Sequence, residues 1–135
     1  MERKNIEPDM WNNNRHIVFD SSYSLLTCDY IYTDLFVILI DKNNLYKAKS
    51  YIKIVFPDVL SWILKKKDVQ QSSKKENGIS IINNSSLLDK ISAESVLSCN
   101  IDDCCHIRLN TDLHIMDVIV RKEDCFILEG KKYKL

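Results

Sequence analysis

Glycine and proline are scarce in this chain, which has two of each among its 135 residues. The glycines, Gly78 and Gly130, lie far apart, so the sequence holds no glycine-rich loop of the kind that cradles phosphate. Neither glycine is next to a cysteine, and no pattern predicts a nucleophile with its base and orienting group. We therefore expect a protein that is not an enzyme and that needs no cofactor.

An excess of charge of one sign is also lacking, because 19 basic side chains balance 19 acidic ones. This balance argues against broad electrostatic binding of nucleic acid. The longest uninterrupted apolar run, Leu35–Ile40, is far too short to span a bilayer. Residues Met1–Asn14 are polar and lack the apolar centre of a signal peptide. We expect no membrane role and a location in the cytoplasm and nucleus.

The cysteine content favours free thiols over a disulfide framework. The five cysteines are an odd number, two of them are adjacent, and free thiols are typical of a reducing compartment. Cys99, Cys104, Cys105 and His106, with His114 further on, are residue types that zinc prefers. Their spacing matches no established zinc pattern, and neighbouring residues of a strand point to opposite faces. We expect no bound metal, and a small zinc module stays open as an alternative.

Three apolar runs separated by turn residues dominate the first half of the chain. Leu35–Ile40 and Leu45–Phe56 flank a polar turn, and Val59–Leu64 follows Pro57 and Asp58. Such runs predict antiparallel strands. The first run is apolar on both faces, which predicts a strand at the centre of a sheet or covered on both sides.

The second run alternates with a period of two, which is typical of a strand with one buried face. The other face carries a basic and aromatic stripe, a candidate contact surface for a protein or for RNA. Its residues are Lys47, Lys49, Tyr51 and Lys53. A second basic segment, Lys65–Lys75, is expected to be a solvated loop, with contact to RNA phosphates as the alternative.

Four short motifs accompany these runs in a fixed order. They are Asp29–Tyr32 before the first strand, Lys42–Asn43 and Tyr46–Lys47 around the turn, and Pro57–Asp58 before the third strand. Their order and spacing resemble the first half of the Sm/LSm small-barrel family, in particular the Sm-like Gemin subunits of the SMN complex. Two features depart from the family. Ala48 stands where glycine is usual, and the RNA-pocket motifs Asp-x-x-x-Asn and Arg-Gly are missing at the matching places.

The resemblance implies a mostly β protein: a small bent-sheet, Sm-like barrel with an N-terminal helix and a C-terminal β extension. Polar residues at 20–22 offer helix caps, so the helix is expected at Tyr23–Tyr32. The expected organisation is a disordered arm over residues 1–14, an Sm-like domain over 15–97 and a β-meander extension with a basic tail over 98–135.

Further strands are expected in the second half of the chain. Ile79–Ile82 and Leu87–Ile91 would complete the barrel, although Ser86 and Asp89 also fit the capping box of a helix. Runs separated by turn residues predict the meander of the extension. The meander and its tail comprise Cys105–Leu109, Leu113–Val120, Asp124–Leu128 and Lys131–Lys134.

By the same resemblance, the chain would be a non-catalytic scaffold subunit that pairs with another Sm-like protein during assembly of small nuclear ribonucleoprotein cores, with an indirect association with RNA. In the family, the fourth and fifth strands leave backbone groups free to pair with a partner. The predicted partner-binding edge consists of Ile79, Ile81, Leu87 and Ile91. The alternatives are an RNA-binding LSm-type protein, which the missing pocket motifs disfavour, and a lineage-specific regulatory protein, including a viral one, that acts through protein contacts.

Overall fold

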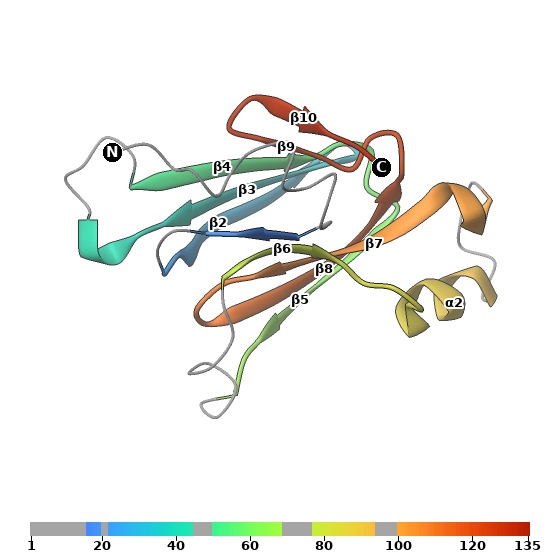
Figure 1. Ribbon diagram of the computed structural model, residues 1–135, viewed down its shortest axis with the longest axis horizontal. Helices are drawn as coiled ribbons and strands as arrows, with labels where there is room; N and C mark the ends of the chain where they lie inside the picture. The colour runs from blue at the N-terminus through green and yellow to red at the C-terminus, as the bar shows by residue number, and fades with distance from the viewer. Residues whose placement is uncertain (1–15, 20–21, 45–49, 69–76, 94–99) are drawn as a thin grey trace.

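The computed structural model describes residues 16–19, 22–44, 50–68, 77–93 and 100–135. They form two antiparallel sheets of five strands each, packed face to face (Figure 1). The order of strands is β1-β6-β7-β8-β5 in sheet A and β10-β9-β4-β3-β2 in sheet B. The protein is therefore mostly β, as predicted, but the strands form two open sheets in place of the expected closed barrel.

Sheet B combines a three-stranded meander with the C-terminal hairpin. Its strands are β2 (Ser24–Ile31), β3 (Asp34–Ile40), β4 (Tyr51–Phe56), β9 (Phe126–Leu128) and β10 (Lys131–Tyr133). The apolar run of β3 is paired on both sides, which confirms its expected place at the centre of a sheet. On β4, Ile52 and Ile54 are buried while Tyr51 and Lys53 are exposed, so the predicted alternation is confirmed there.

Sheet A draws its strands from both halves of the chain. They are β1 (His16–Val18), β5 (Ser61–Lys66), β6 (Gly78–Ile81), β7 (Cys104–Asn110) and β8 (His114–Arg121). Strands β7 and β8, expected in an appended extension, lie between β6 and β5 and complete the sheet. The boundary expected between residues 97 and 98 therefore does not divide the sheets into two units.

The helix expected at Tyr23–Tyr32 is absent, because these residues form strand β2. They pair along the whole of β3, from Ser24 opposite Ile40 to Ile31 opposite Asp34. Polar residues before the run resemble a helix cap, but the run itself is rich in β-branched and aromatic side chains, which pack well on a sheet. Long-range pairing with an apolar neighbour outweighs a local signal for helix initiation.

The strand expected at Leu87–Ile91 is helical in the structure and belongs to α2 (Ser86–Ala93). The backbone N–H of Leu88 donates to Oγ of Ser85 at 2.9 Å, which is a side-chain cap at the first turn. Buried Ile91 packs on Cys104 and Ile119, which belong to the face of sheet A that points away from sheet B. The capping signal in the sequence was thus correct in kind and displaced by one residue.

The basic tail expected after Gly130 is a paired strand. In β10, Lys131 lies opposite Leu128, and Tyr133 lies opposite Phe126. The rings of Phe126 and Tyr133 stack with centroids 4.9 Å apart, and both side chains are buried. An aromatic contact therefore anchors residues whose lysines suggested a solvated tail.

One apolar core fills the space between the two sheets. Its largest fully buried side chains come from both layers, so each sheet covers the apolar face of the other. They are Tyr23, Phe56, Phe126, Ile17, Leu35, Leu39, Ile52, Ile54, Ile79, Ile107 and Leu109. The disordered arm expected over residues 1–14 lies outside the described residues.

Candidate functional site

Strands β2 and β5 lie at the edges of the two sheets on the same side of the molecule. Among the described residues, β3 is the single strand that pairs with β2, and β8 is the single strand that pairs with β5. Tyr30 of β2 contacts Trp62 of β5, with ring centroids 6.2 Å apart, so the two edges are neighbours. A strand with one unpaired side offers backbone N–H and C=O groups to another chain.

Large apolar side chains are exposed along these two edges, and we refer to them as the open rim. Its residues are Leu26, Tyr30, Ile31, Tyr32, Ile63 and Leu64. Tyr32, in the turn after β2, is 95 % exposed, and Tyr30 is 48 % exposed. Exposed aromatic and aliphatic side chains along an edge with unpaired backbone groups are typical of a protein-binding surface.

The four sheet edges differ in how well they are protected against another strand. β10 is three residues long and carries Lys131 and Lys132, and β1 is equally short. β5 carries Lys65 and Lys66. β2 is eight residues long, and Asp29 is its single charged residue. Short length and lysines are the usual protection of an edge, so β2 is the least protected of the four.

A β-bulge gives β2 partial protection. Leu25 pairs with Leu39 and Thr27 with Ile38, so Leu26 has no partner opposite it on β3. A bulge increases local twist and interrupts a regular ladder. An added strand would therefore pair most regularly with the part of β2 that follows the bulge.

The predicted partner-binding edge at Ile79, Ile81, Leu87 and Ile91 is not an edge in the structure. Ile79 and Ile81 belong to β6, which lies between β1 and β7, and Ile79 is fully buried. Leu87 and Ile91 belong to α2 and pack toward sheet A. The prediction was wrong because strands from the C-terminal third of the chain cover the position that the family resemblance leaves open.

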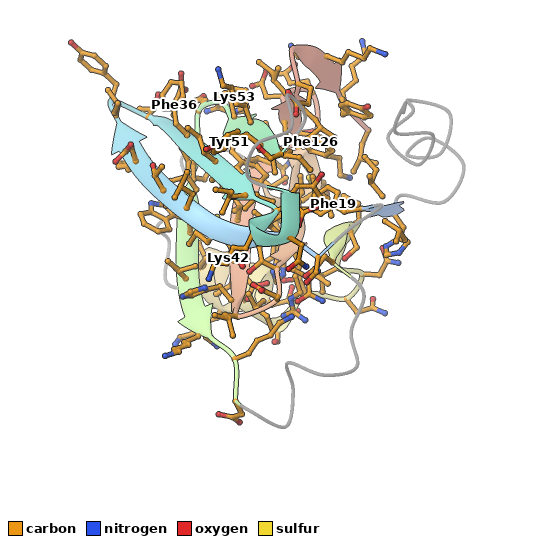
Figure 2. All side chains as sticks on the ribbon, turned by 90° about the vertical axis from the view of Figure 1, so that its left-hand side faces the viewer. Phe19, Phe36, Lys42, Tyr51, Lys53 and Phe126 are labelled. Atoms are coloured by element: carbon orange, nitrogen blue, oxygen red, sulfur yellow. The ribbon has the colours of Figure 1, made fainter. Side chains whose placement is uncertain are left out.

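The predicted basic and aromatic stripe is described only in part. Tyr51 and Lys53 are exposed on β4, on the outer face of sheet B near Phe36, as Figure 2 shows. Lys47 and Lys49 lie outside the described residues. The basic segment Lys65–Lys75 is likewise described only at its start, where Lys65 and Lys66 end β5.

A buried polar network that the sequence did not predict joins α2 to sheet A. Nδ1 of His106 lies 2.6 Å from Oγ of Ser85, and Nε2 lies 2.7 Å from Oδ1 of Asp117. Arg108 also donates to this carboxylate oxygen from Nε at 2.8 Å. An ionised carboxylate only accepts, so His106 Nε2–H donates to Asp117.

Serine, histidine and aspartate in series are the residue types of a nucleophilic triad. Here the Ser85 oxygen also accepts the N–H of Leu88, and the three side chains are each more than nine-tenths buried. A substrate would have to displace α2 to reach them. The geometry therefore suits a structural tie between the helix cap and strands β7 and β8.

The electrostatics of Asp117 fit this structural role. Burial by itself raises the pKa of a carboxyl group, but hydrogen bonds from His106 and Arg108, together with the Arg108 charge, outweigh it and lower the pKa of Asp117 below its ordinary value of 3.8. Sequence distance hid this network, because its members come from a helix cap and two strands. Polar residues inside otherwise apolar strand runs were the available signal.

The cysteines do not assemble the predicted zinc candidate. Cys99 lies outside the described residues, and Cys104 and Cys105 contribute to different apolar clusters, one beneath α2 and one between the sheets. Within the part of the chain that the structure describes, no three histidine, cysteine or acidic side chains are grouped to hold a metal ion. The described thiols are Cys28, Cys104, Cys105 and Cys125, all free.

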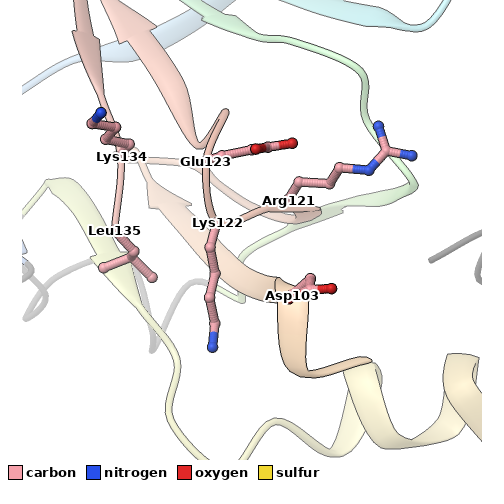
Figure 3. Close-up of a pocket in the computed structure, with 6 residues that line it drawn as sticks. All are labelled: Asp103, Arg121, Lys122, Glu123, Lys134 and Leu135. Carbon is pink, nitrogen blue, oxygen red and sulfur yellow. The ribbon is translucent and has the colours of Figure 1, made fainter. Parts of the chain in front are cut away.

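A surface pocket of about 510 Å³ lies beside the turn between β8 and β9 (Figure 3). Arg121 in its wall is ion-paired with Asp58, and Lys122 and Glu123 point into different directions from the same turn. Mixed charges without a buried polar group do not define a ligand of one kind. The pocket is lined by Asp103, Arg121, Lys122, Glu123, Lys134 and Leu135.

No protein-family model matches the chain, and neither a curated protein nor a solved structure matches it. No helix among the described residues combines the length and the apolar character needed to cross a membrane.

Proposed function

We propose that this protein is a non-catalytic binding subunit that pairs with a partner protein along the edge of β2. The observation that carries the proposal is the state of this strand. It is eight residues long, it pairs with one neighbouring strand among the described residues, and it carries one charge. A partner strand would gain main-chain hydrogen bonds there, and the open rim would supply apolar contacts.

The identity of the partner is proposed from the sequence resemblance alone. The Sm-like motifs between Asp29 and Pro57–Asp58 argue for a role like that of the sixth Gemin, which would pair with a second Sm-like protein in assembly of small nuclear ribonucleoprotein cores, in cytoplasm and nucleus. The pairing strand is then β2, and the site moves away from β6 and α2. Association with RNA would be indirect, through the assembled complex.

The test compares an edge variant with a variant of the exposed sheet face. Ile31→Lys places a charge on the part of the β2 edge that follows the bulge, and Tyr51→Lys places the same charge on the interior strand β4. Both side chains are exposed, so both variants should fold. We expect wild type and Tyr51→Lys to capture the same Sm-like protein from native extract, and Ile31→Lys to lose it.

Purified components then measure the interaction directly. The isolated wild-type chain should self-associate in sedimentation velocity, and the captured Sm-like protein should convert it to a heterodimer. Capture that survives in Ile31→Lys, or a monodisperse monomer that binds no Sm-like protein, would contradict the proposal. Capture of RNA with a steep dependence on salt and loss in Tyr51→Lys would favour the RNA-binding alternative.

A further inference from the structure

Two buried thiols face each other across the sandwich. Sγ of Cys105 and Sγ of Cys125 are 3.8 Å apart. Cys105 belongs to β7 of sheet A, and Cys125 directly precedes β9 of sheet B. Their exposed fractions are 5 % and 0 %. A bond between them would join the two sheets. In the sequence, the hairpin of β7 and β8 separates the two cysteines.

The neighbouring cysteine provides a natural comparison. Cys104 lies on the opposite face of β7, beneath α2, and its thiol donates to the carbonyl of Asn100 at 3.4 Å. Cys125 donates to the carbonyl of Lys122 at 3.2 Å and also contacts Cys105. The geometry therefore selects one pair of sulfurs.

We propose that Cys105 and Cys125 form a reversible intramolecular disulfide when the protein meets a peroxide. The sulfurs are about 2.05 Å apart in a disulfide, so side-chain rotation and a small movement of the turn before β9 suffice to join them. The bond would fix the start of β9 to β7, the central strand of sheet A.

The reaction consumes one molecule of hydrogen peroxide. The Cys125 thiolate attacks one peroxide oxygen, the O–O bond breaks, and hydroxide leaves while Cys125 becomes a sulfenic acid. The Cys105 sulfur then attacks the Cys125 sulfur, gives up its proton, and displaces the hydroxyl as water. The two thiols lose two electrons, which reduce the peroxide to water.

The surroundings assign the order of the two thiols. The hydrogen bond from the Cys105 thiol, with the backbone N–H of Leu135, holds the pKa of Cys125 below its ordinary value. The same hydrogen bond and burial raise the pKa of Cys105. The thiolate is the nucleophile toward peroxide, so Cys125 reacts first and Cys105 resolves the sulfenic acid.

The pocket shown in Figure 3 lies beside the turn that precedes Cys125. Its walls include Asp103 and Glu123, which stand two residues before Cys105 and Cys125 respectively. Lys122 and Glu123 of the same turn are exposed, so local opening of this turn exposes Cys125 without unfolding a sheet.

The experiment uses the folded full-length chain treated with hydrogen peroxide and quenched by alkylation. Trypsin should then release one linked product, in which the peptide of residues 91–108 is joined to the peptide of residues 123–131. Because the first peptide holds three cysteines, alanine variants assign the sulfur. The linked product should persist in Cys104→Ala, disappear in Cys105→Ala and Cys125→Ala, and vanish after dithiothreitol.

Thermal unfolding provides the second measurement. The oxidised wild-type chain should melt several degrees above the reduced chain, because the cross-link restricts the unfolded ensemble. The mass of the folded wild-type chain should fall by that of two hydrogen atoms after peroxide treatment. An unchanged mass would overturn the proposal, and this measurement needs no variant. A linkage that requires urea, that involves Cys104 or Cys99, or that is replaced by sulfinic acid would overturn it as well.

Discussion

At the scale of single residues, His106 links two structural elements through one buried side chain. It joins the hydroxyl that caps α2 to the carboxylate of Asp117 on β8. Arg108 donates a second hydrogen bond to that carboxylate. Removing one member of such a buried network leaves its partners without hydrogen bonds, which costs about 1–3 kcal/mol for each unsatisfied group. The network is thus a specific point at which α2 is held on sheet A.

The depressed pKa of Asp117 predicts a defined loss of stability in acid. Its stabilising contribution is complete above its unfolded-state pKa, near 3.8, and is lost as pH falls through the lower folded-state pKa. Asp117→Asn should therefore lower the urea midpoint at neutral pH. Below about pH 4 the variant should lose less further stability than wild type does. Urea titrations at a series of pH values measure both effects.

A surface carboxylate serves as the control for this prediction. Asp58 is partly exposed and ion-paired with Arg121, and such surface pairs add little stability, so Asp58→Asn should lower the urea midpoint at neutral pH less than Asp117→Asn does. If the urea midpoints of wild type and Asp117→Asn fall in parallel through the acid range, the Asp117 carboxylate adds no pH-dependent stability and the prediction is wrong.

At the scale of secondary-structure elements, the local residue pattern predicts which segments are strands better than it predicts which strands pair with each other. The alternation on β4 and the apolar run of β3 are visible in the sequence because each reports its own period. β2 was taken for a helix because residues before Tyr23 resemble a cap, and only pairing with β3 reveals the strand. The tail at Lys131–Tyr133 reads as polar because the stacking of Tyr133 on Phe126 is a tertiary contact.

The candidate site shows the same limit. Whether a strand is an edge depends on every other strand of the sheet, so Ile81 gave no local sign that β7 would cover it. Likewise, Ser85 and His106, or Cys105 and Cys125, are separated in sequence by whole elements. Their residue types are visible in the sequence, but their proximity follows only from the topology.

The turn between β9 and β10 allows a prediction about a single element. Leu128 pairs with Lys131 across Glu129 and Gly130, whose φ angles are 51° and 83°. Positive φ at both central positions defines a type I′ turn, for which Asn-Gly is the preferred sequence. Glu129→Asn should therefore relieve backbone strain and stabilise the protein by about 0.5 kcal/mol, seen as a higher urea midpoint.

The matched variant for this turn is Glu129→Ala, which removes the same side chain but keeps an unfavourable residue at positive φ. It should not raise the midpoint. Equal stabilisation by alanine and asparagine would assign the gain to loss of the glutamate charge, and the argument from turn geometry would fail.

At the scale of the whole molecule, the order of strands makes the two halves of the chain interdependent. β7 and β8 from the C-terminal segment separate β6 from β5, and β9 extends sheet B beside β4. Nearly half of the described residues of the main core come from positions after 97. The sequence predicted an appended extension there, because a meander with its own turns looks independent when its pairing partners are unknown.

This arrangement predicts that residues 1–97 do not fold alone. Without β8, strand β5 has no neighbour in sheet A, and the faces of β3 and β4 toward the core lose the layer that buries them. The free energy of apolar burial that is lost with residues 98–135 exceeds the free energy of unfolding of a domain of this size, which is about 5–15 kcal/mol. The fragment should show no cooperative urea transition, whereas a chain lacking only residues 1–13 should unfold cooperatively near the wild-type midpoint.

Adding a separate peptide of residues 98–135 to the fragment should restore a transition, because β7 and β8 can then insert between β6 and β5. A cooperative transition of the fragment by itself would mean that residues 15–97 form a self-sufficient barrel after all, and the site would return to β6.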